Sequence, residues 1–159
     1  MFYVQIWKMN KMKIEKDNLI HDVKLISLPI YQDERGKLLH MIKSEMSAFK
    51  GFGEIYFSYT NFGVIKGWYM QKKNFSNFSV LFGGVKLVIF DDRKSSRTFN
   101  SVQEINLSLS NYHLVTIPPK VWYSFKTIKG RFSILANLID KPYRENEVRK
   151  NNINCKKFP

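Results

Sequence analysis

The chain has 159 residues, a length that suits one domain, and hydrophobic residues make up 44% of it, which excludes a disordered chain. No apolar run approaches the ~20 residues needed to span a membrane. The formal charge of +13 attracts polyanions, yet the charges are spread along the chain without an arginine-rich run, so we expect no nucleic-acid partner. The lone Cys155 and the early Lys8, Lys11 and Lys13, which interrupt any export signal, favour the cytoplasm.

The domain is expected to begin after an N-terminal extension at residues 1–18 and to occupy residues 19–159 as one unit. Its first strands are predicted at 23–30 and 37–42, on either side of the turn signal Asp33-Glu34-Arg35-Gly36. After a glycine-bearing loop at 44–54, short apolar runs recur about every ten residues. Further strands are predicted at 55–61, 63–71, 78–82, 85–92, 102–108, 112–118, 121–128 and 132–139.

Glycine and proline pairs separate several of these runs. Gly83-Gly84 predicts a tight turn between two strands, and Pro118-Pro119 ends a strand because proline donates no ladder hydrogen bond. The one segment with a helical pattern is 143–152, near the C-terminus. Regularly spaced short strands predict an all-β sandwich or barrel.

Five motifs occur in a fixed order, and together the chain resembles the dTDP-4-dehydrorhamnose 3,5-epimerase family, in its epimerase-like branch. The resemblance covers residues 23–147. The motifs are "DERG" at 33–36, "GVIKGWYMQ" at 63–71, "GGVKLVIFDDRKSSRTF" at 83–99, "LVTIPPKVWYSF" at 114–125 and "PYRENE" at 142–147.

This resemblance implies a cupin-type double-stranded jelly-roll barrel with an N-terminal strand extension, usually a homodimer whose N-terminal strands cross to the partner. It implies no metal and no cofactor. Members bind a nucleotide-diphospho-4-keto-sugar in the barrel and move a proton on the carbon beside the ketone. Such a site needs a base, an acid on the opposite face, and a cation near the enolate.

The catalytic residues that the resemblance implies depart from the family pattern. Tyr69 stands where the family has its catalytic histidine base, and Tyr143 is the phenol nearest the family's tyrosine acid. Lys66 stands where an arginine is usual, so the charge is kept and the planar fork is lost. We expect Tyr69, Tyr143 and Lys66 to be the catalytic residues.

The same matching implies four substrate-binding residues. Arg35 fits an arginine that reaches the nucleotide, and Lys72 lies close to a family lysine that is missing here. Tyr123 stands at a second histidine position, beside Trp122, and both are expected to line the sugar and nucleotide end of the barrel. An earlier family tyrosine falls near Ala136.

The replacement of both barrel histidines by tyrosine raises a chemical difficulty. Histidine titrates near ~6.5 and tyrosine near ~10, so ionising an unperturbed phenol at pH 7 costs about 4 kcal/mol. Lys66 is three residues from Tyr69, and on a regular strand such residues point to opposite faces. A bulge or turn is therefore required before Lys66 can assist Tyr69.

Two functions remain open from the sequence. One is an epimerase or keto-isomerase of a dTDP-4-keto-6-deoxy sugar, or a related sugar nucleotide, in surface polysaccharide or lipopolysaccharide biosynthesis. The other is a catalytically impaired cupin that binds a sugar nucleotide or a pathway partner, which the double loss of histidine favours. The sugar, and whether one or two carbons are inverted, stay open.

Other polar residues receive plainer interpretations. His21, His40 and His113 share no face and no carboxylate spacing, so no metal site is expected. Asp91-Asp92-Arg93 resembles a carboxylate pair but sits at a strand end, where a turn-stabilising salt link is the simpler interpretation.

Overall fold

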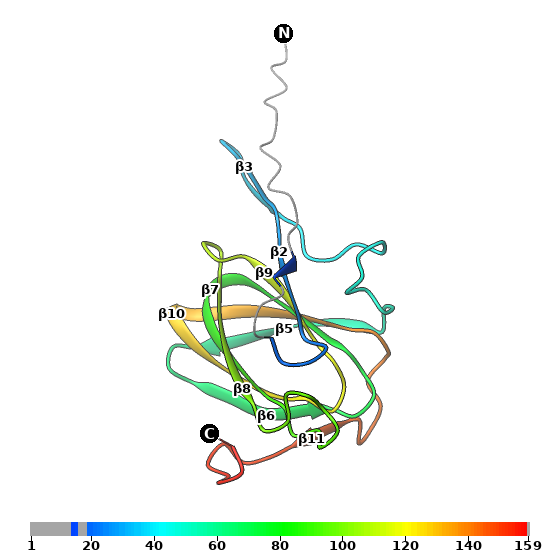
Figure 1. The fold of residues 1–159 in the computed structure, drawn as a ribbon. Helices are drawn as coiled ribbons and strands as arrows, with labels where there is room; N and C mark the ends of the chain where they lie inside the picture. The colour runs from blue at the N-terminus through cyan, green and yellow to red at the C-terminus, as the bar shows by residue number, and fades with distance from the viewer. Residues whose placement is uncertain (1–13, 16–18, 159) are drawn as a thin grey trace.

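The computed structural model describes residues 14–15 and 19–158, and it is built of strands joined by turns (Figure 1). The predicted all-β fold is confirmed. Of the predicted extension at 1–18, β1 (Ile14–Glu15) is described and pairs antiparallel with β2 (Lys24–Ser27), while 1–13 and 16–18 lie outside the described residues. Over the described part of the chain, no helix has the length and apolar character that crossing a membrane requires.

Two long strands form the frame of the barrel, β7 (Ser76–Phe90) and β10 (Trp122–Ile139). They pair antiparallel along their whole length, with register shifts near the middle of each. The predicted tight turn at Gly83-Gly84 is therefore wrong, because β7 continues through it. The separate strands predicted at 121–128 and 132–139 are likewise one strand.

Glycines let both strands bend where their register shifts. Gly83 has a φ of 73° and Gly130 a φ of 83°, in the region that favours glycine. A Cβ on Gly83 would lie 2.4 Å from the carbonyl oxygen of Phe132, so the two backbones approach too closely for any side chain there. The glycine pair thus marks a bend in a continuous strand.

The bend divides β7 and β10 between two facing sheets. In the first sheet the order is β1, β2, β9 (His113–Ile117), β7, β10 and β5 (Glu54–Asn61). In the second it is β8 (Val102–Ser108), β7, β10, β6 (Ile65–Gln71) and β11 (Val148–Lys150). Two sheets that share bent strands make the jelly-roll barrel.

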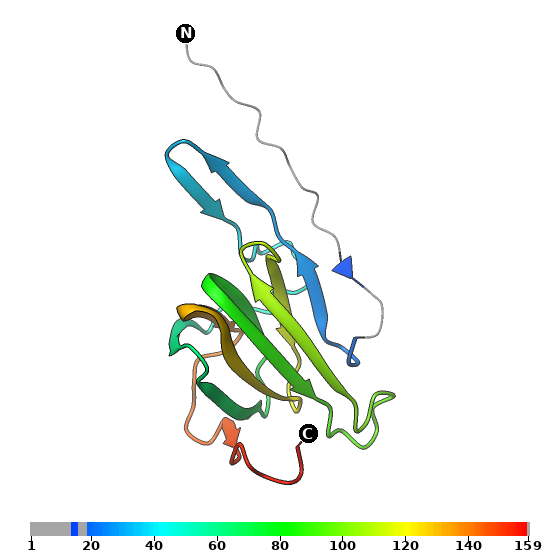
Figure 2. The ribbon, with the colours of Figure 1, turned by 90° about the vertical axis from the view of Figure 1, so that its left-hand side faces the viewer.

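A separate hairpin of β3 (Ile30–Asp33) and β4 (Gly36–Leu39) projects beyond the barrel (Figure 2). The predicted turn at 33–36 is confirmed, and the Asp33 carboxylate accepts a hydrogen bond from the Arg35 N–H at 2.9 Å. The strand predicted at 23–30 is divided between β2 and β3.

The helical pattern at 143–152 is wrong as a prediction. This segment makes a turn and then β11, which pairs with β6. The Glu147 carboxylate accepts hydrogen bonds from the backbone N–H groups of Lys73 (2.6 Å) and Asn74 (3.1 Å). These tertiary bonds override a weak local helix preference.

The core lies between the sheets and follows the strand period of two. Val85, Leu87 and Ile89 on β7 all point inward and are fully buried. Each such side chain stabilises the fold by roughly 1.5–3 kcal/mol. At the end of β7 the buried Asp91 carboxylate accepts hydrogen bonds from Arg93, which confirms the turn-stabilising interpretation of this motif.

Candidate active site

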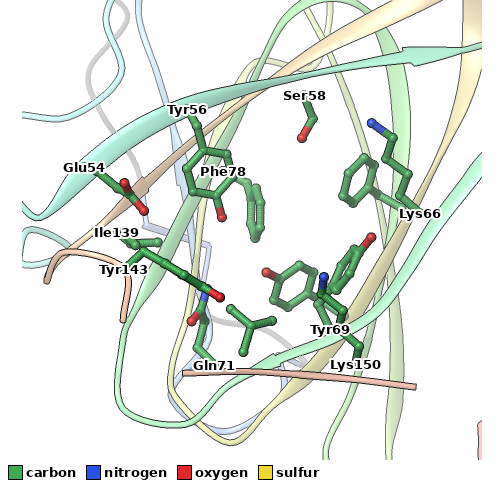
Figure 3. Close-up of a pocket in the computed structure, with 13 residues that line it drawn as sticks. Glu54, Tyr56, Ser58, Lys66, Tyr69, Gln71, Phe78, Ile139, Tyr143 and Lys150 are labelled. Atoms are coloured by element: carbon green, nitrogen blue, oxygen red, sulfur yellow. The ribbon is translucent and has the colours of Figure 1, made fainter. Parts of the chain in front are cut away.

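A cavity of about 470 Å³ lies inside the barrel (Figure 3). Sites for small ligands span roughly 300–1,000 Å³, so this volume can hold a sugar ring. Its lining includes a carboxylate, Glu54, and two lysines, Lys66 and Lys150. Among the described residues that line it there is no histidine, but there are four phenols: Tyr56, Tyr69, Tyr123 and Tyr143.

The bulge that Lys66 requires is present on β6. Tyr69 pairs with Tyr123 of β10, and Lys66 pairs with Phe125, so three steps along β6 oppose two steps along β10. The extra residue turns Lys66 and Tyr69 to the same side, and both line the cavity. A Cβ on Gly67 would lie 2.4 Å from Cβ of Ser124, so the bulge needs glycine.

Tyr69 and Tyr123 lie side by side, with ring centroids 5.9 Å apart. Tyr123 also packs edge-on against Phe78 at 5.0 Å. Burial raises the pKa of the Tyr123 phenol well above its usual value, and the nearby Ser76 and Gln71 offset this only in part. Tyr123 therefore keeps its proton at neutral pH and cannot act there as a base.

The opposite wall of the cavity is β5, which was predicted as a strand at 55–61 but not as part of the site. Glu54, Tyr56 and Ser58 alternate along β5 and point inward. The intervening Ile55 and Phe57 point outward and are exposed. The strand thus turns polar residues to the interior and apolar ones to the surface, which is the reverse of a core strand. This inverted alternation was the signal in the sequence that could have identified β5 as a wall of the cavity.

Two buried asparagines, Asn137 and Asn77, hold the hydroxyl of Tyr56, whose side chain is itself 38% exposed. The Asn137 amide nitrogen donates a hydrogen bond to the Tyr56 hydroxyl at 2.6 Å. The Asn137 amide oxygen accepts one from the backbone N–H of Asn77 at 3.0 Å. Burial raises the pKa of the Tyr56 phenol, although the Asn137 bond acts in the opposite direction. Tyr56 is therefore a neutral phenol at physiological pH.

The mouth of the cavity is formed by residues after β10. Tyr143 comes from the loop that follows β10 and is 57% exposed, and its hydroxyl points into the cavity (Figure 3). Lys150, on the edge strand β11, pairs with Tyr69 and adds a second cation that the sequence analysis missed. Gln71 also lines the cavity, and within residues 14–15 and 19–158 its buried amide oxygen has no hydrogen-bond partner.

Three of the predicted substrate-binding residues lie outside this cavity. Arg35 is on the β3–β4 hairpin, 79% exposed and paired with Asp33. Lys72 borders a second hollow of about 810 Å³, whose wall includes Met70. Met70 alternates with Tyr69 along β6, so this hollow lies on the other face of that strand.

Trp122 is also turned away from the cavity. It is buried in a cluster outside the second sheet, where its ring lies 5.1 Å from that of Phe158. The C-terminal segment therefore packs against the Trp122 ring. Of the four predicted substrate-binding residues, Tyr123 lies in the cavity.

The described residues contain no group of three histidine, cysteine, aspartate or glutamate side chains placed to hold a metal ion. The cavity presents a carboxylate, phenols and lysines to a ligand. These groups can accept a proton, donate a proton and stabilise an oxyanion, respectively.

The fold and the cavity together define the class of protein, a cupin-type jelly roll with a polar ligand cavity inside the barrel. A family model described as dTDP-4-dehydrorhamnose 3,5-epimerase matches residues 17–158. The chain belongs to this family.

Individual relatives agree with this placement. The structure of a dTDP sugar isomerase from Desulfovibrio desulfuricans G20 is 30% identical, with a TM-score of 0.85 over 88% of this chain and 90% of that one. A dTDP-4-dehydrorhamnose 3,5-epimerase from Bacillus anthracis, solved with TDP and PPi bound, is 25% identical, with a TM-score of 0.81 over 93% and 88% of the two chains. The "Probable low-salt glycan biosynthesis epimerase Agl13" of Haloferax volcanii is 29% identical over 74% of this chain and 77% of its own.

Proposed function

We propose that the protein inverts a carbon beside the ketone of a dTDP-4-keto-6-deoxy sugar, or of a related nucleotide-diphospho-4-keto-sugar. The observation that carries this proposal is the β6 bulge, which turns Lys66 and Tyr69 into one cavity that also contains Glu54. Family membership supports the substrate class. The glycan-biosynthesis name of the Haloferax relative supports a role in making sugars for surface polysaccharide or lipopolysaccharide.

The proposed reaction moves one proton between two faces of the sugar. Glu54 lies on β5 of the first sheet and Tyr69 on β6 of the second, so they face the cavity from opposite walls (Figure 3). The Glu54 carboxylate takes the proton from the carbon beside the ketone, and the C–H electron pair shifts to the carbonyl oxygen as an enolate. Tyr69 then donates its phenolic proton to the other face, and exchange with water restores both groups.

Because Glu54 is the base and Tyr69 is the acid in this reaction, the weak basicity of a phenol is no obstacle. Carboxyl groups ordinarily titrate near ~4.3, whereas tyrosine titrates near ~10 and is suited to donating a proton at neutral pH. Tyr143, at the mouth and on the Glu54 side in Figure 3, is the second proposed proton-handling phenol. Lys66 and Lys150 are the cations for the enolate and the diphosphate.

We also propose that the protein is a homodimer. The outer face of β5 carries Ile55, Phe57 and Tyr59, of which Phe57 is 58% and Tyr59 57% exposed. Tyr59 stacks on Phe132 at 4.4 Å, which stacks on Phe82 at 4.8 Å and widens the apolar surface. Such a surface is costly to leave in water, and a second copy would cover it. In a dimer the projecting hairpin could carry Arg35 to the partner's nucleotide.

Deuterium exchange tests the enzymatic proposal. The protein is incubated in heavy water with dTDP-4-keto-6-deoxyglucose and with several other nucleotide-linked 4-keto sugars. We expect deuterium at C3, at C5 or at both in at least one of them, at a rate proportional to the protein concentration. Absence of exchange in all of them would reject the proposal.

A second candidate function is a sugar-nucleotide binder without catalysis. Two observations favour it: no histidine among the described residues lines the cavity, and burial raises the pKa of Tyr123. Under this alternative, the double variant Tyr69→His and Tyr123→His creates or raises exchange activity. If the double variant instead abolishes an activity that the natural protein has, the binder alternative is excluded.

A further inference from the structure

We propose that Tyr56 is a catalytic residue that donates a hydrogen bond to the ketone oxygen of the ligand, and that Asn137 is the positioning residue that sets the direction of this hydrogen. Neither residue was identified from the sequence. The inference rests on the proposed function, because it names the group that stabilises the enolate in the same cavity.

The orientation of the Asn137 amide is fixed by its surroundings. Its side chain is buried, and one terminal atom faces the backbone N–H of Asn77, which can only donate. That atom must be the amide oxygen. Asn77 is held in turn, because its own amide oxygen accepts a hydrogen bond from the Thr116 hydroxyl at 2.8 Å and its amide nitrogen donates to the Leu138 carbonyl at 3.1 Å.

This orientation determines where the Tyr56 hydrogen points. The Asn137 nitrogen has no acceptor capacity, so in its 2.6 Å contact the Tyr56 oxygen is the acceptor. The phenolic hydrogen must then point away from Asn137. Among the described residues Asn137 is the one hydrogen-bond partner of this hydroxyl. The hydroxyl points into the cavity (Figure 3), so its hydrogen is available to a ligand.

Protonation and environment suit this donor role. Burial raises the pKa of Tyr56, and the charge of the neighbouring Glu54 acts in the same direction. The phenol therefore stays protonated when Glu54 is ionised. A fixed donor in the cavity stabilises the oxyanion that develops on the ketone more than it stabilises the neutral ketone. Removing one such donor typically lowers the rate by 10²–10³-fold.

The test compares Tyr56→Phe with Tyr59→Phe. Both remove one hydroxyl from the same strand, but Tyr59 faces outward and is exposed. With dTDP-4-keto-6-deoxyglucose in heavy water, we expect Tyr56→Phe to lower the rate of deuterium incorporation by roughly 10²–10³-fold. We expect Tyr59→Phe to stay within about threefold of the natural protein. A Tyr56→Phe rate equal to the Tyr59→Phe rate would overturn the inference and leave the proposed function standing.

Asn137→Asp tests the positioning role. A carboxylate at 137 would accept a hydrogen bond from Tyr56, so the phenolic hydrogen would turn away from the ligand. We expect the exchange rate to fall with little change in KM, and we expect no further fall when Asn137→Asp is added to Tyr56→Phe. A further large fall in the double variant would contradict the positioning role. Should Asn137→Asp not fold, the Tyr56→Phe comparison decides the inference.

Calorimetric binding separates this inference from the proposed function. If the natural protein shows no exchange, the proposed function fails. The hydrogen bond from Tyr56 to the ketone oxygen can still be tested by measuring the affinity for the keto sugar. We then expect Tyr56→Phe to weaken binding of dTDP-4-keto-6-deoxyglucose by about three- to tenfold and to leave dTDP binding unchanged. Equal affinities in the two proteins, or no binding by the natural protein, would overturn the inference.

Discussion

Lys66 and Tyr69 lie on the same side of β6 although they are three residues apart, because the bulge opposite Tyr123 and Phe125 shifts the register by one residue. A regular strand would send one of these side chains into the cavity and the other away from it. The bulge therefore decides whether a lysine and a phenol can act on one ligand.

Gly67→Ala tests the bulge. The new Cβ would lie 2.4 Å from Cβ of Ser124, so we expect the free energy of unfolding to fall by about 2–3 kcal/mol and Lys66 to be displaced. Gly63→Ala is the control, since Gly63 also has a positive φ, 76°, but open space around it. It should cost about 1 kcal/mol. Urea unfolding measures both, and equal losses would contradict the close-contact argument.

Asp91→Asn tests the ion pair between Asp91 and Arg93 at the end of β7. Burial acts to raise the pKa of Asp91, but hydrogen bonds from Arg93, Ser96 and Thr98 outweigh it and lower the pKa to about 2. A pKa lowered in the folded state gives stability that is present above pH ~4 and is lost as the pH falls toward 2. We expect Asp91→Asn to lose about 2 kcal/mol at pH 7 and much less at pH 2.5.

Asp92→Asn is the matched control for this prediction. Asp92 pairs with Lys157 at the surface, and such pairs contribute about 0–1 kcal/mol. Urea unfolding at both pH values should therefore show little change in Asp92→Asn. A loss in Asp91→Asn that does not depend on pH would contradict the cause assigned to the shifted pKa.

The strand rhythm and the five ordered motifs were enough to predict the fold and the family, because both depend on local patterns that the sequence displays. The continuity of β7 was not predictable from Gly83-Gly84, since the same dipeptide serves a hairpin turn and a bend in a long strand. The helix predicted at 143–152 was wrong, because pairing of β11 with β6 outweighs the local helical pattern there. The extension at 1–18, the single domain at 19–159 and the cytoplasmic location stay predictions.

The candidate site was predictable only where motifs marked it. Lys66, Tyr69, Tyr123 and Tyr143 were named from their motif positions, and all four line the cavity. Glu54 was missed because alternation on β5 does not say which face is inside when the interior holds a polar cavity instead of a core. Trp122 was misplaced because its contact with Phe158 joins residues far apart in the sequence.

Phe57→Glu tests the proposed homodimer. A carboxylate on the outer face of β5 should oppose the association of two apolar surfaces, so we expect the variant to be a monomer with an unchanged fold. Phe99→Glu is the control, since Phe99 is also exposed but lies in the loop after β7. Sedimentation measures the mass of each. A natural protein that is monomeric at high concentration would contradict the proposal.

Tyr69→Phe tests the two-wall reaction. If Glu54 removes the proton and Tyr69 returns it from the other side, the variant should still exchange deuterium through Glu54 while inverting the carbon at least 10²-fold more slowly. The ratio of inversion to exchange, measured by NMR, therefore falls. Equal losses of inversion and exchange would show that Tyr69 acts before the enolate forms, as a base.

The proposed reaction begins when the Glu54 carboxylate removes a proton from a nucleotide-linked 4-keto sugar in this cavity. The most direct measurement is the rate of deuterium incorporation into dTDP-4-keto-6-deoxyglucose at pH 7 by the natural protein and by Glu54→Gln. We predict incorporation by the natural protein and a loss of about 10²–10⁴-fold in Glu54→Gln, with dTDP binding retained. Equal rates in the two proteins would show that Glu54 is not the base.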